Sequence, residues 1–162
     1  MPPSVRLRTA RAADLPALLA LEQTFPGDRM SARQFRHHLA SPRALWRVAD
    51  AGGKLLGYAL VLRRRDSTRA RLYSIAVDSS ARGQGLGRRL LAAAEEDAFR
   101  AGCTAMTLEV RQDNATANAL YQAAGYRRLA ALPAYYEDGA PGWRYLKRTT
   151  PNEPGSFARS RK

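Results

Sequence analysis

Three glycines, Gly83, Gly85 and Gly87, lie within five residues, directly before a segment with helical apolar spacing. Glycine adopts a positive φ without steric cost and lets a ligand approach the main chain closely. The segment 71–77 ahead of them is rich in β-branched and aromatic residues and predicts a strand, whereas 86–98 predicts a helix. The first amides of a helix have no internal partner and carry the positive end of its dipole. The glycines therefore predict a binding site for phosphate or pyrophosphate.

Two familiar phosphate-binding motifs do not fit this turn. The dinucleotide fingerprint G-x-G-x-x-G requires a glycine at position 88 or 90, where the sequence has Arg88 and Leu90. The Walker motif G-x-x-x-x-G-K-[ST] also requires a glycine at 88, and no lysine follows nearby. Taken alone, the turn is compatible with an anion site or with an ordinary tight turn before a packed helix.

Length and composition are those of one soluble globular domain. The chain has 162 residues, of which 45% are hydrophobic, enough for one core. Its single cysteine, Cys103, excludes an internal disulfide, and the adjacent His37 and His38 are interpreted as helix-surface residues, so no metal site is predicted. No apolar run approaches the roughly 18 residues of a membrane span, and the N-terminus lacks a signal-peptide pattern. We expect a cytoplasmic protein with no membrane partner.

The charge is strongly positive, with 27 basic and 14 acidic residues and a formal net charge of +13. Such a field attracts polyanions, including nucleic acid and multiply phosphorylated cofactors. Nearly all of the excess is arginine, a bias typical of a GC-rich genome, which favours a solvated basic surface. The run 63–71 lies between two strand-like segments and predicts a hairpin loop. It has no interleaved aromatic residues for base stacking, so no specific nucleic-acid partner is predicted.

Hydrophobic periodicity and turn residues predict an α+β domain with about seven strands and about four helices. The strand 70–77, the helix to about 101 and the strand 104–110 form a β-α-β unit, which makes one parallel step in a mixed, mostly antiparallel sheet. Ligands gather where the order of such a sheet switches, here at the end of the strand 70–77. Residues 1–148 are assigned to the domain and 149–162 to a flexible basic tail. The other predicted strands are 5–9, 45–50, 55–63, 126–132 and 143–148, and the other helices are 14–25, 31–40 and 114–124.

Two segments together carry a resemblance to a known family: IAVDSSARGQGLGRRLL at 75–91 and LEVRQDNATANALYQAAGY at 108–126. In combination they closely resemble the GNAT superfamily of acetyl-coenzyme A dependent N-acetyltransferases. Within it, they are similar to the bacterial ribosomal-protein-alanine N-acetyltransferases. The resemblance covers about 5–148 and is strongest at 75–136.

The resemblance implies that the cofactor is acetyl-coenzyme A. The amides of 83–87 would cradle its pyrophosphate, while Arg82 and Arg88 either assist or are incidental surface arginines. The strand matching 75–77 would pair with the pantetheine arm, and a main-chain amide there would polarise the thioester carbonyl. The cofactor-binding residues implied in this way are Ile75, Ala76, Val77, Arg82, Gly83, Gln84, Gly85, Leu86, Gly87, Arg88, Asn114 and Tyr121.

The resemblance also implies two catalytic proton-transfer roles. Glu109 aligns with the general base that takes a proton from the amine, and Tyr121 with the general acid that protonates the leaving thiolate. Asn114 matches a cofactor contact and lies two helical turns before Tyr121 on the same face. Each residue has a structural alternative: an exposed partner for an arginine for Glu109, a core tyrosine for Tyr121, and a helix N-cap for Asn114.

The acceptor amine is defined less sharply. Keeping an α-amine neutral at pH 7 costs about 1.4 kcal/mol, against about 4.6 kcal/mol for a lysine, so a single carboxylate suits a protein N-terminus better. Tyr135 and Tyr136 match a substrate-binding pair that lines the peptide groove in the ribosomal-protein enzymes. We therefore expect acetylation of a protein or peptide N-terminus, with a ribosomal protein as one candidate partner. The segments 25–35 and 137–148 depart from that subfamily, which leaves a small-molecule amine as the alternative.

A non-catalytic module that binds coenzyme A or nucleic acid is the remaining alternative. The presence of Glu109, Asn114 and Tyr121 together argues against a mere coenzyme A sensor. No recognition helix, zinc-ligand spacing or aromatic platform in the sequence supports a nucleic-acid binder.

Overall fold

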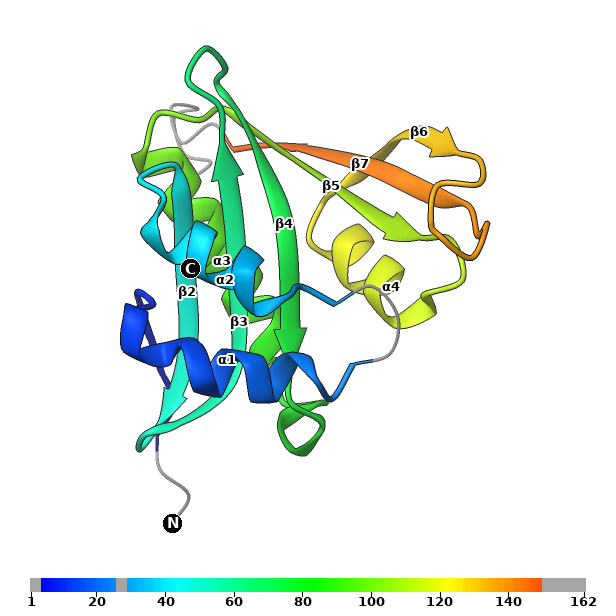
Figure 1. Cartoon of the computed structure of the whole chain (residues 1–162). Helices are drawn as coiled ribbons and strands as arrows, with labels where there is room; N and C mark the ends of the chain where they lie inside the picture. Colours follow the sequence, from blue (N-terminus) through cyan, green and yellow to red (C-terminus); the bar gives the residue numbers. More distant parts are fainter. Residues whose placement is uncertain (1–3, 26–28, 150–162) are drawn as a thin grey trace.

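The computed structural model describes residues 4–25 and 29–149, so 150–162 of the predicted tail lies outside the described residues and the domain boundary stays a prediction. Within these ranges the chain forms a seven-stranded sheet in the order β1-β2-β3-β4-β5-β7-β6, with helices on both faces (Figure 1). Neighbouring strands are antiparallel except β4 and β5, which are parallel. The predicted α+β class and its parallel step are confirmed. The strands are β1 (Arg6–Arg8), β2 (Ala44–Ala51), β3 (Lys54–Arg63), β4 (Arg69–Val77), β5 (Ala105–Arg111), β6 (Arg127–Leu132) and β7 (Gly142–Arg148), and the helices are α1 (Leu15–Glu22), α2 (Ala32–Ala40), α3 (Leu86–Arg100) and α4 (Ala115–Ala123).

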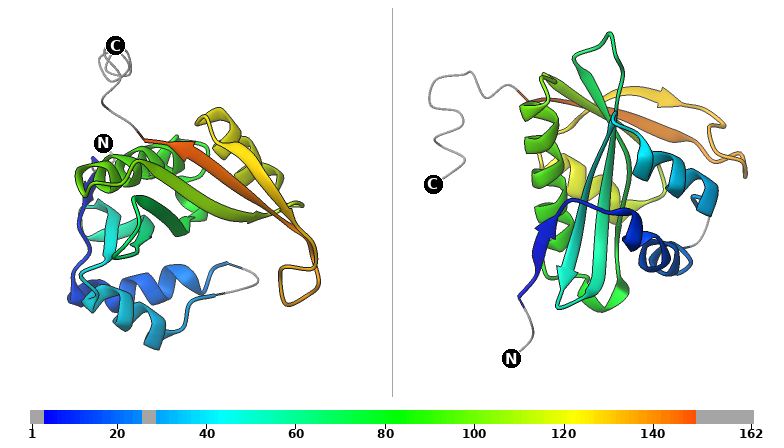
Figure 2. Two further views of the ribbon diagram at one scale, coloured as in Figure 1. Left: turned by 90° about the horizontal axis from the view of Figure 1, so that it is seen from above. Right: turned by 60° about the vertical axis from the view of Figure 1, so that its left-hand side comes forward.

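Helices lie on both faces of the sheet (Figure 2), and a hydrophobic core lies beneath them on each face. α3 covers one face, where Leu90 and Met106 belong to one buried cluster. α1 and α2 cover the other face, where Leu18, Phe35 and Tyr58 belong to the second. Successive side chains of a strand point to opposite faces, so the central strands contribute to both cores.

Helix boundaries follow local hydrogen bonding. α2 begins after Ser31, whose Oγ accepts the amide of Gln34 at 3.1 Å while the Gln34 side chain accepts the amide of Ser31 at 2.8 Å. The first helix is shorter than the predicted 14–25 and ends at Glu22. The reason is that the amides of Thr24 and Phe25 bond to carbonyls three residues back, which tightens the chain into a turn. No helix in the described ranges is long and apolar enough to cross a membrane.

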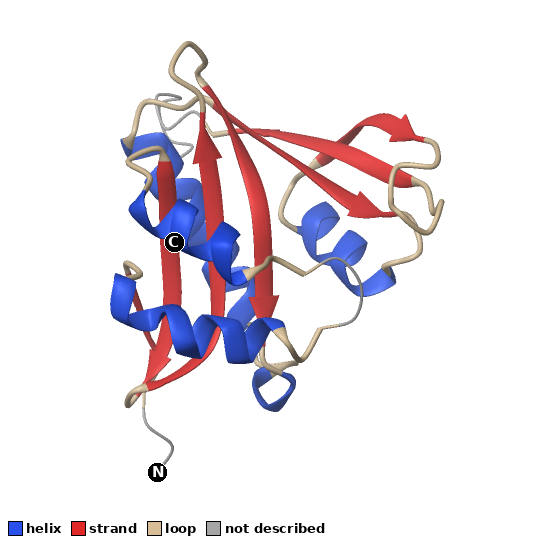
Figure 3. Cartoon of the chain, in the orientation of Figure 1, coloured by secondary structure: helices blue, strands red, loops and turns tan. Residues whose placement is uncertain are grey.

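β4 and β5 separate soon after they meet. Their register pairs only 69–71 with 105–107, although β4 continues to Val77 and β5 to Arg111. Beyond this point the two strands diverge, as Figures 1 and 3 show. On its other side β4 stays paired with β3 to its end, where Gly57 lies opposite Val77. Among the described residues, the edge of β4 that faces the opening has no strand partner after Arg71.

Candidate active site

The glycine turn has a left-handed main chain at two of its three glycines. Gly83 has a φ of 79° and Gly85 a φ of 77°, a region that residues with a Cβ rarely adopt. Gly87 lies outside that region, and a Cβ there would meet Val77 Cγ2 at 3.7 Å and Leu120 Cδ2 at 3.8 Å, which are ordinary contacts. The glycine cluster suggested a positive φ or the close approach of a ligand, and the positive φ is present at Gly83 and Gly85 but not at Gly87.

The N-terminus of α3 presents main-chain amides at the end of the β4 opening. Gly85 is the N-cap residue, and within the described part of the chain no side chain caps this helix and no acidic residue lies in its first turn. By contrast, Ser31 caps α2 and Asn114 caps α4. Uncapped amides at the positive end of a helix dipole form a favourable position for an anion.

The side chains around this turn differ in what they offer to a ligand. Arg82, Gln84 and Arg88 are exposed, whereas Leu86 is buried in the α3 core, so only its main chain is accessible. The Arg82 guanidinium lies 5.6 Å from the centre of the Phe25 ring. The Arg88 side chain donates to a main-chain carbonyl of α4 at 3.3 Å.

The main chain of 75–77 leads from the opening to the glycine turn. Ile75 and Ala76 pair with β3 opposite Ala59 and Tyr58, so one edge of this segment is held by the sheet. An open strand edge offers amides and carbonyls to an extended ligand. The predicted cofactor positions 75–77 and 82–88 therefore lie along one continuous path from the open edge of β4 to the first turn of α3, whereas Asn114 and Tyr121 belong to the N-cap and the body of α4.

Glu109 lies on β5 at the mouth of the opening and contacts two arginines. Its Oε1 accepts from Arg71 Nε of β4 at 2.7 Å, and its Oε2 accepts from Arg144 Nε of β7 at 3.0 Å. The carboxylate side chain is only 8% exposed, whereas those of Arg71 and Arg144 are 46% and 38% exposed. The structural alternative, an exposed partner for an arginine, is confirmed for the arginine contact and wrong for the exposure, and the role of base stays a prediction.

Tyr121 lies on α4 and is 5% exposed. Its ring centre is 5.9 Å from that of Tyr126 and 6.2 Å from that of Tyr145. Burial, with a smaller contribution from Tyr136, raises the pKa of Tyr121 above its ordinary value of 10.0. The hydroxyl therefore keeps its proton at neutral pH, as a proton donor must. Tyr121 is a core tyrosine, as the structural alternative expected, and its role as acid stays a prediction.

The side chain of Asn118, which the sequence analysis did not single out, fixes α4 to the sheet. It is 8% exposed and donates to the carbonyls of Arg111 and Asn114 at 3.0 and 2.7 Å, while it accepts from the Tyr145 hydroxyl at 2.7 Å. Asn114 itself accepts a first-turn amide of α4 at 3.1 Å, so its N-cap role is confirmed. In the sequence, the signal that could have identified Asn118 is a polar residue on the inner face of a short predicted helix. These bonds hold the helix that carries Tyr121.

The two predicted substrate-binding tyrosines lie in the loop between β6 and β7. The rings of Tyr135 and Tyr136 are perpendicular with centres 5.1 Å apart, and Tyr135 is 42% exposed. At the end of β5, Arg111 lies 5.3 Å from the centre of the Tyr136 ring and pairs with Asp113 and Asp138 at 3.0 and 2.8 Å. The loop is thus held close to the end of β5.

On the face that carries α1 and α2, the buried carboxylate at the end of α1 bonds to residues from two other parts of the chain. Glu22 is 5% exposed and accepts the amide of Met30 and the hydroxyl of Tyr58, both at 2.8 Å. The same hydroxyl lies 2.7 Å from Ser74 Oγ on β4. The sequence analysis missed this network because its members are far apart in the chain. Residues 26–28, between α1 and α2, lie outside the described residues.

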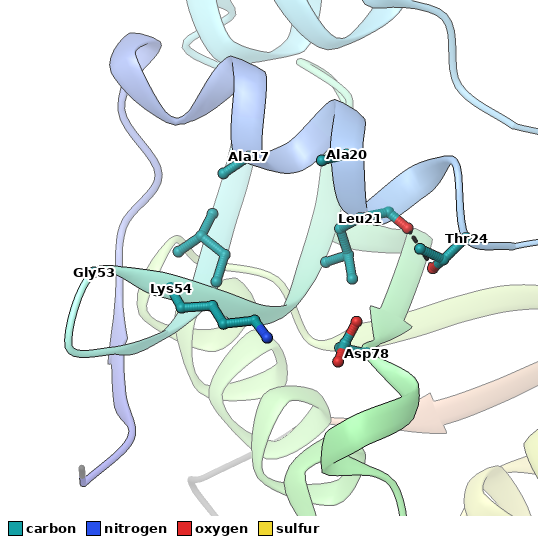
Figure 4. A pocket seen from close by; sticks show the side chains of 8 residues that line it. Ala17, Ala20, Leu21, Thr24, Gly53, Lys54 and Asp78 are labelled. Carbon is teal, nitrogen blue, oxygen red and sulfur yellow. Dashed lines mark hydrogen bonds between the residues drawn. The ribbon is translucent and has the colours of Figure 1, made fainter.

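A cavity of about 400 Å³ opens between α1, the β2–β3 turn and the end of β4 (Figure 4). It is lined by Ala17, Ala20, Leu21, Thr24, Gly53, Lys54, Leu55 and Asp78. None of these is a predicted site residue. The candidate site is thus an opening between strands, because its ligand path follows a strand edge rather than a closed cavity.

Comparison with known proteins agrees with this geometry. Residues 13–126 match the model of the acetyltransferase (GNAT) family. The N-alpha-acetyltransferase RimI of Mycobacterium tuberculosis is 37% identical over 134 residues, which cover 81% of this chain and 80% of that protein. The crystal structure of the ribosomal-protein-S18-alanine N-acetyltransferase from Escherichia coli has a TM-score of 0.82 at 28% identity, covering 91% of this chain and 95% of that one. An uncharacterised Mycobacterium leprae protein is 39% identical over 132 residues, although the matched part is only 36% of its length.

An open strand edge that leads to an uncapped, glycine-containing helix start can hold an extended ligand that carries a phosphate group. The family match specifies the class: the chain belongs to the GNAT family of acetyltransferases, whose donor is acetyl-coenzyme A. Its relatives include ribosomal-protein-alanine N-acetyltransferases. The predicted family, fold class and enzyme type are confirmed.

Proposed function

We propose that this protein transfers the acetyl group of acetyl-coenzyme A to the N-terminal α-amino group of a protein or peptide. The observation that carries the proposal is the convergence of three features at one opening. They are the unpaired edge of β4, the uncapped N-terminus of α3, and a largely buried carboxylate, Glu109, at the mouth. In that order, they suit an extended cofactor arm, a pyrophosphate group and the proton that the amine loses.

The residues present fit coenzyme A. The first-turn amides of α3 and the left-handed Gly83 and Gly85 suit its pyrophosphate, with Arg82 and Arg88 nearby as cations. The open edge of 75–77 suits its extended pantetheine arm. Bound in this way, acetyl-coenzyme A supplies an acetyl thioester, the activated acyl group of the reaction.

The residues of this chain then take a proton from the amine, give a proton to the leaving sulfur and stabilise the negative charge that develops on the acetyl oxygen. Glu109 accepts the proton that the amine loses, directly or through one water; a carboxylate has about four lone-pair positions, and Arg71 and Arg144 use two of them. Tyr121 donates its Oη proton to the leaving sulfur; a tyrosine hydroxyl with its ordinary pKa of 10.0 is protonated at neutral pH, and burial raises that pKa further. A main-chain amide of 75–77 stabilises the negative charge on the acetyl oxygen.

An α-amine is the acceptor that this single carboxylate can serve best. Its pKa near 8 makes neutralisation at pH 7 roughly 3 kcal/mol cheaper than for a lysine. The names of two relatives, an N-alpha-acetyltransferase and a ribosomal-protein-alanine N-acetyltransferase, support the same class of acceptor. The N-terminus of a ribosomal protein is therefore one candidate substrate.

The test is release of free thiol from acetyl-coenzyme A in the presence of three acceptors. These are a peptide with a free α-amine, the same peptide acetylated at its N-terminus and carrying one lysine, and a small primary amine. We expect release with the first peptide, and mass spectrometry should place the acetyl group on its first residue. A clear preference for the lysine peptide or for the small amine would overturn the proposed acceptor.

A further inference from the structure

Arg71, Glu109 and Arg144 form a row across three neighbouring strands, where β4 and β5 separate. Arg144 lies directly opposite Glu109 in the register of β5 and β7. Arg71 is the last residue of β4 that pairs with β5, opposite Thr107. Thr107 and Glu109 point to the same face because they are two residues apart on one strand, whereas Leu108 points into the core below α3. The row therefore lies on the face that carries α1 and α2.

This row has one more positive charge than negative charge. Each guanidinium contacts one oxygen of Glu109, at 2.7 and 3.0 Å, and Glu109 is the largely buried member. Among the ion pairs of the described residues, neither Arg71 nor Arg144 has a second acidic partner. A guanidinium carries five N–H donors, and both of these arginines are more than one-third exposed. Donors and a net positive charge are thus available at the surface of the opening.

Arg111 does not contribute to this surplus, although it lies two residues from Glu109 on the same strand. It makes four hydrogen bonds to the carboxylates of Asp113 and Asp138. Arg71, by contrast, contacts only one carboxylate and lies 5.4 Å from the centre of the Tyr73 ring, which limits where its guanidinium points. The free positive charge therefore lies next to Glu109 and not at the end of β5.

The distance from Arg71 and Arg144 to the acceptor amine indicates which part of the acceptor these arginines can contact. A general base lies within hydrogen-bond reach of the amine or one water away, so the arginine nitrogens lie at most about 6 Å from the amine nitrogen in direct contact and at most about 9 Å through one water. One extended residue spans about 3.3 to 3.6 Å, which brings the side chain of the second residue into this range. We propose that Arg71 and Arg144 bind a carboxylate at the second residue of the acceptor, so that N-termini followed by Asp or Glu are preferred. This inference rests on the proposed function, because it specifies the acceptor of the same site.

The kinetic test compares two peptides that differ only at the second residue, Ala-Glu and Ala-Gln. We expect kcat/KM of the wild-type enzyme to be roughly three- to tenfold higher for the glutamate peptide, mainly through KM, because partly exposed charge-assisted contacts are of this size. Arg144→Gln should bring the ratio close to one. Arg148→Gln removes the same charge from the exposed end of the same strand and should keep the wild-type ratio. A wild-type ratio near one overturns the inference, and so does a ratio unchanged in both Arg144→Gln and Arg71→Gln.

A binding measurement separates this inference from the proposed function. Calorimetry of the two peptides with the coenzyme A complex needs no turnover, and thermal unfolding checks that each variant is folded. If the wild-type protein binds the glutamate peptide more tightly and Arg144→Gln abolishes this difference, the inferred carboxylate site is supported. This holds even if no peptide is acetylated, in which case only the proposed function fails. Equal binding of both peptides, with normal acetylation of both, retains the proposed function and overturns the inference.

Discussion

Replacement of Glu109 by glutamine separates the base role of this residue from its structural role. The carboxylate accepts one hydrogen bond from each of two arginines whose side chains are 46% and 38% exposed. Ion pairs with such exposed partners are screened by solvent and salt, so the two together contribute only about 1 kcal/mol to the free energy of unfolding. For a chain of this size we expect the melting temperature to fall by roughly 2 to 4 °C. The variant should therefore be folded under assay conditions.

The expected kinetic loss depends on pH. An α-amine with a pKa near 8 is about 1% neutral at pH 6 and about 90% neutral at pH 9. Without its base, Glu109→Gln should be slower by roughly 10² to 10⁴ at pH 6, and much of this loss should disappear by pH 9 because the amine is then already neutral. The assay is kcat/KM for a peptide with a free α-amine, measured by thiol release from pH 6 to 9.5.

A matched control is Glu95→Gln, which removes a carboxylate that pairs with Lys147 at 3.0 Å on the α3 side of the sheet. Its pH profile should follow that of the wild-type enzyme. Near wild-type rates for Glu109→Gln at pH 6 would remove Glu109 from the mechanism. A loss of constant size across the pH range would refute deprotonation of the amine as its task.

Three further variants test the rest of the site. Tyr121→Phe should slow turnover by roughly 10² to 10⁴ with little change in cofactor affinity, and high pH should not restore it, because the missing proton belongs to the sulfur; equal rescue of this variant at pH 9.5 would contradict the acid role. Gly85→Val forces a branched residue to φ 77° and should weaken acetyl-coenzyme A binding in calorimetry, whereas Gly87→Ala, with ordinary contacts at 3.7 and 3.8 Å, should change it less. Tyr145→Phe leaves Asn118 Oδ1 without its donor at 2.7 Å and should cost about 1 to 3 kcal/mol in urea unfolding, and an unchanged midpoint would show that the bond contributes nothing.

Features determined by short stretches of sequence were predicted well. The positive φ of Gly83 and Gly85 follows from glycine in a tight turn, and the start of α2 follows from the reciprocal bonds of Ser31 and Gln34. The end of α1 was missed because the amides of Thr24 and Phe25 bond to carbonyls three residues back, a change that apolar periodicity does not indicate.

Strand order and the partners of Glu109 could not be read from the sequence. β7 enters the sheet between β5 and β6, although strands that follow each other in sequence are usually neighbours. That insertion brings Arg144 next to Glu109 from 35 residues away, while Arg71 comes from 38 residues away in the other direction. Each residue taken alone is typical of a solvated strand surface. Only the register of three strands brings them together as one charged row.

The divergence of β4 and β5 connects the two proton-transfer roles. Tyr121 belongs to the core on the α3 side of the sheet, whereas Glu109 points to the face that carries α1 and α2. A sheet that stayed paired beyond Arg71 and Thr107 would place a layer of hydrogen-bonded main chain between them. Because the pairing stops there, the proposed mechanism places the acyl group along the edge of β4, with Glu109 on one face and Tyr121 on the other. In that mechanism, the short parallel step provides both the edge for the donor and the passage through which the two residues act on one reaction.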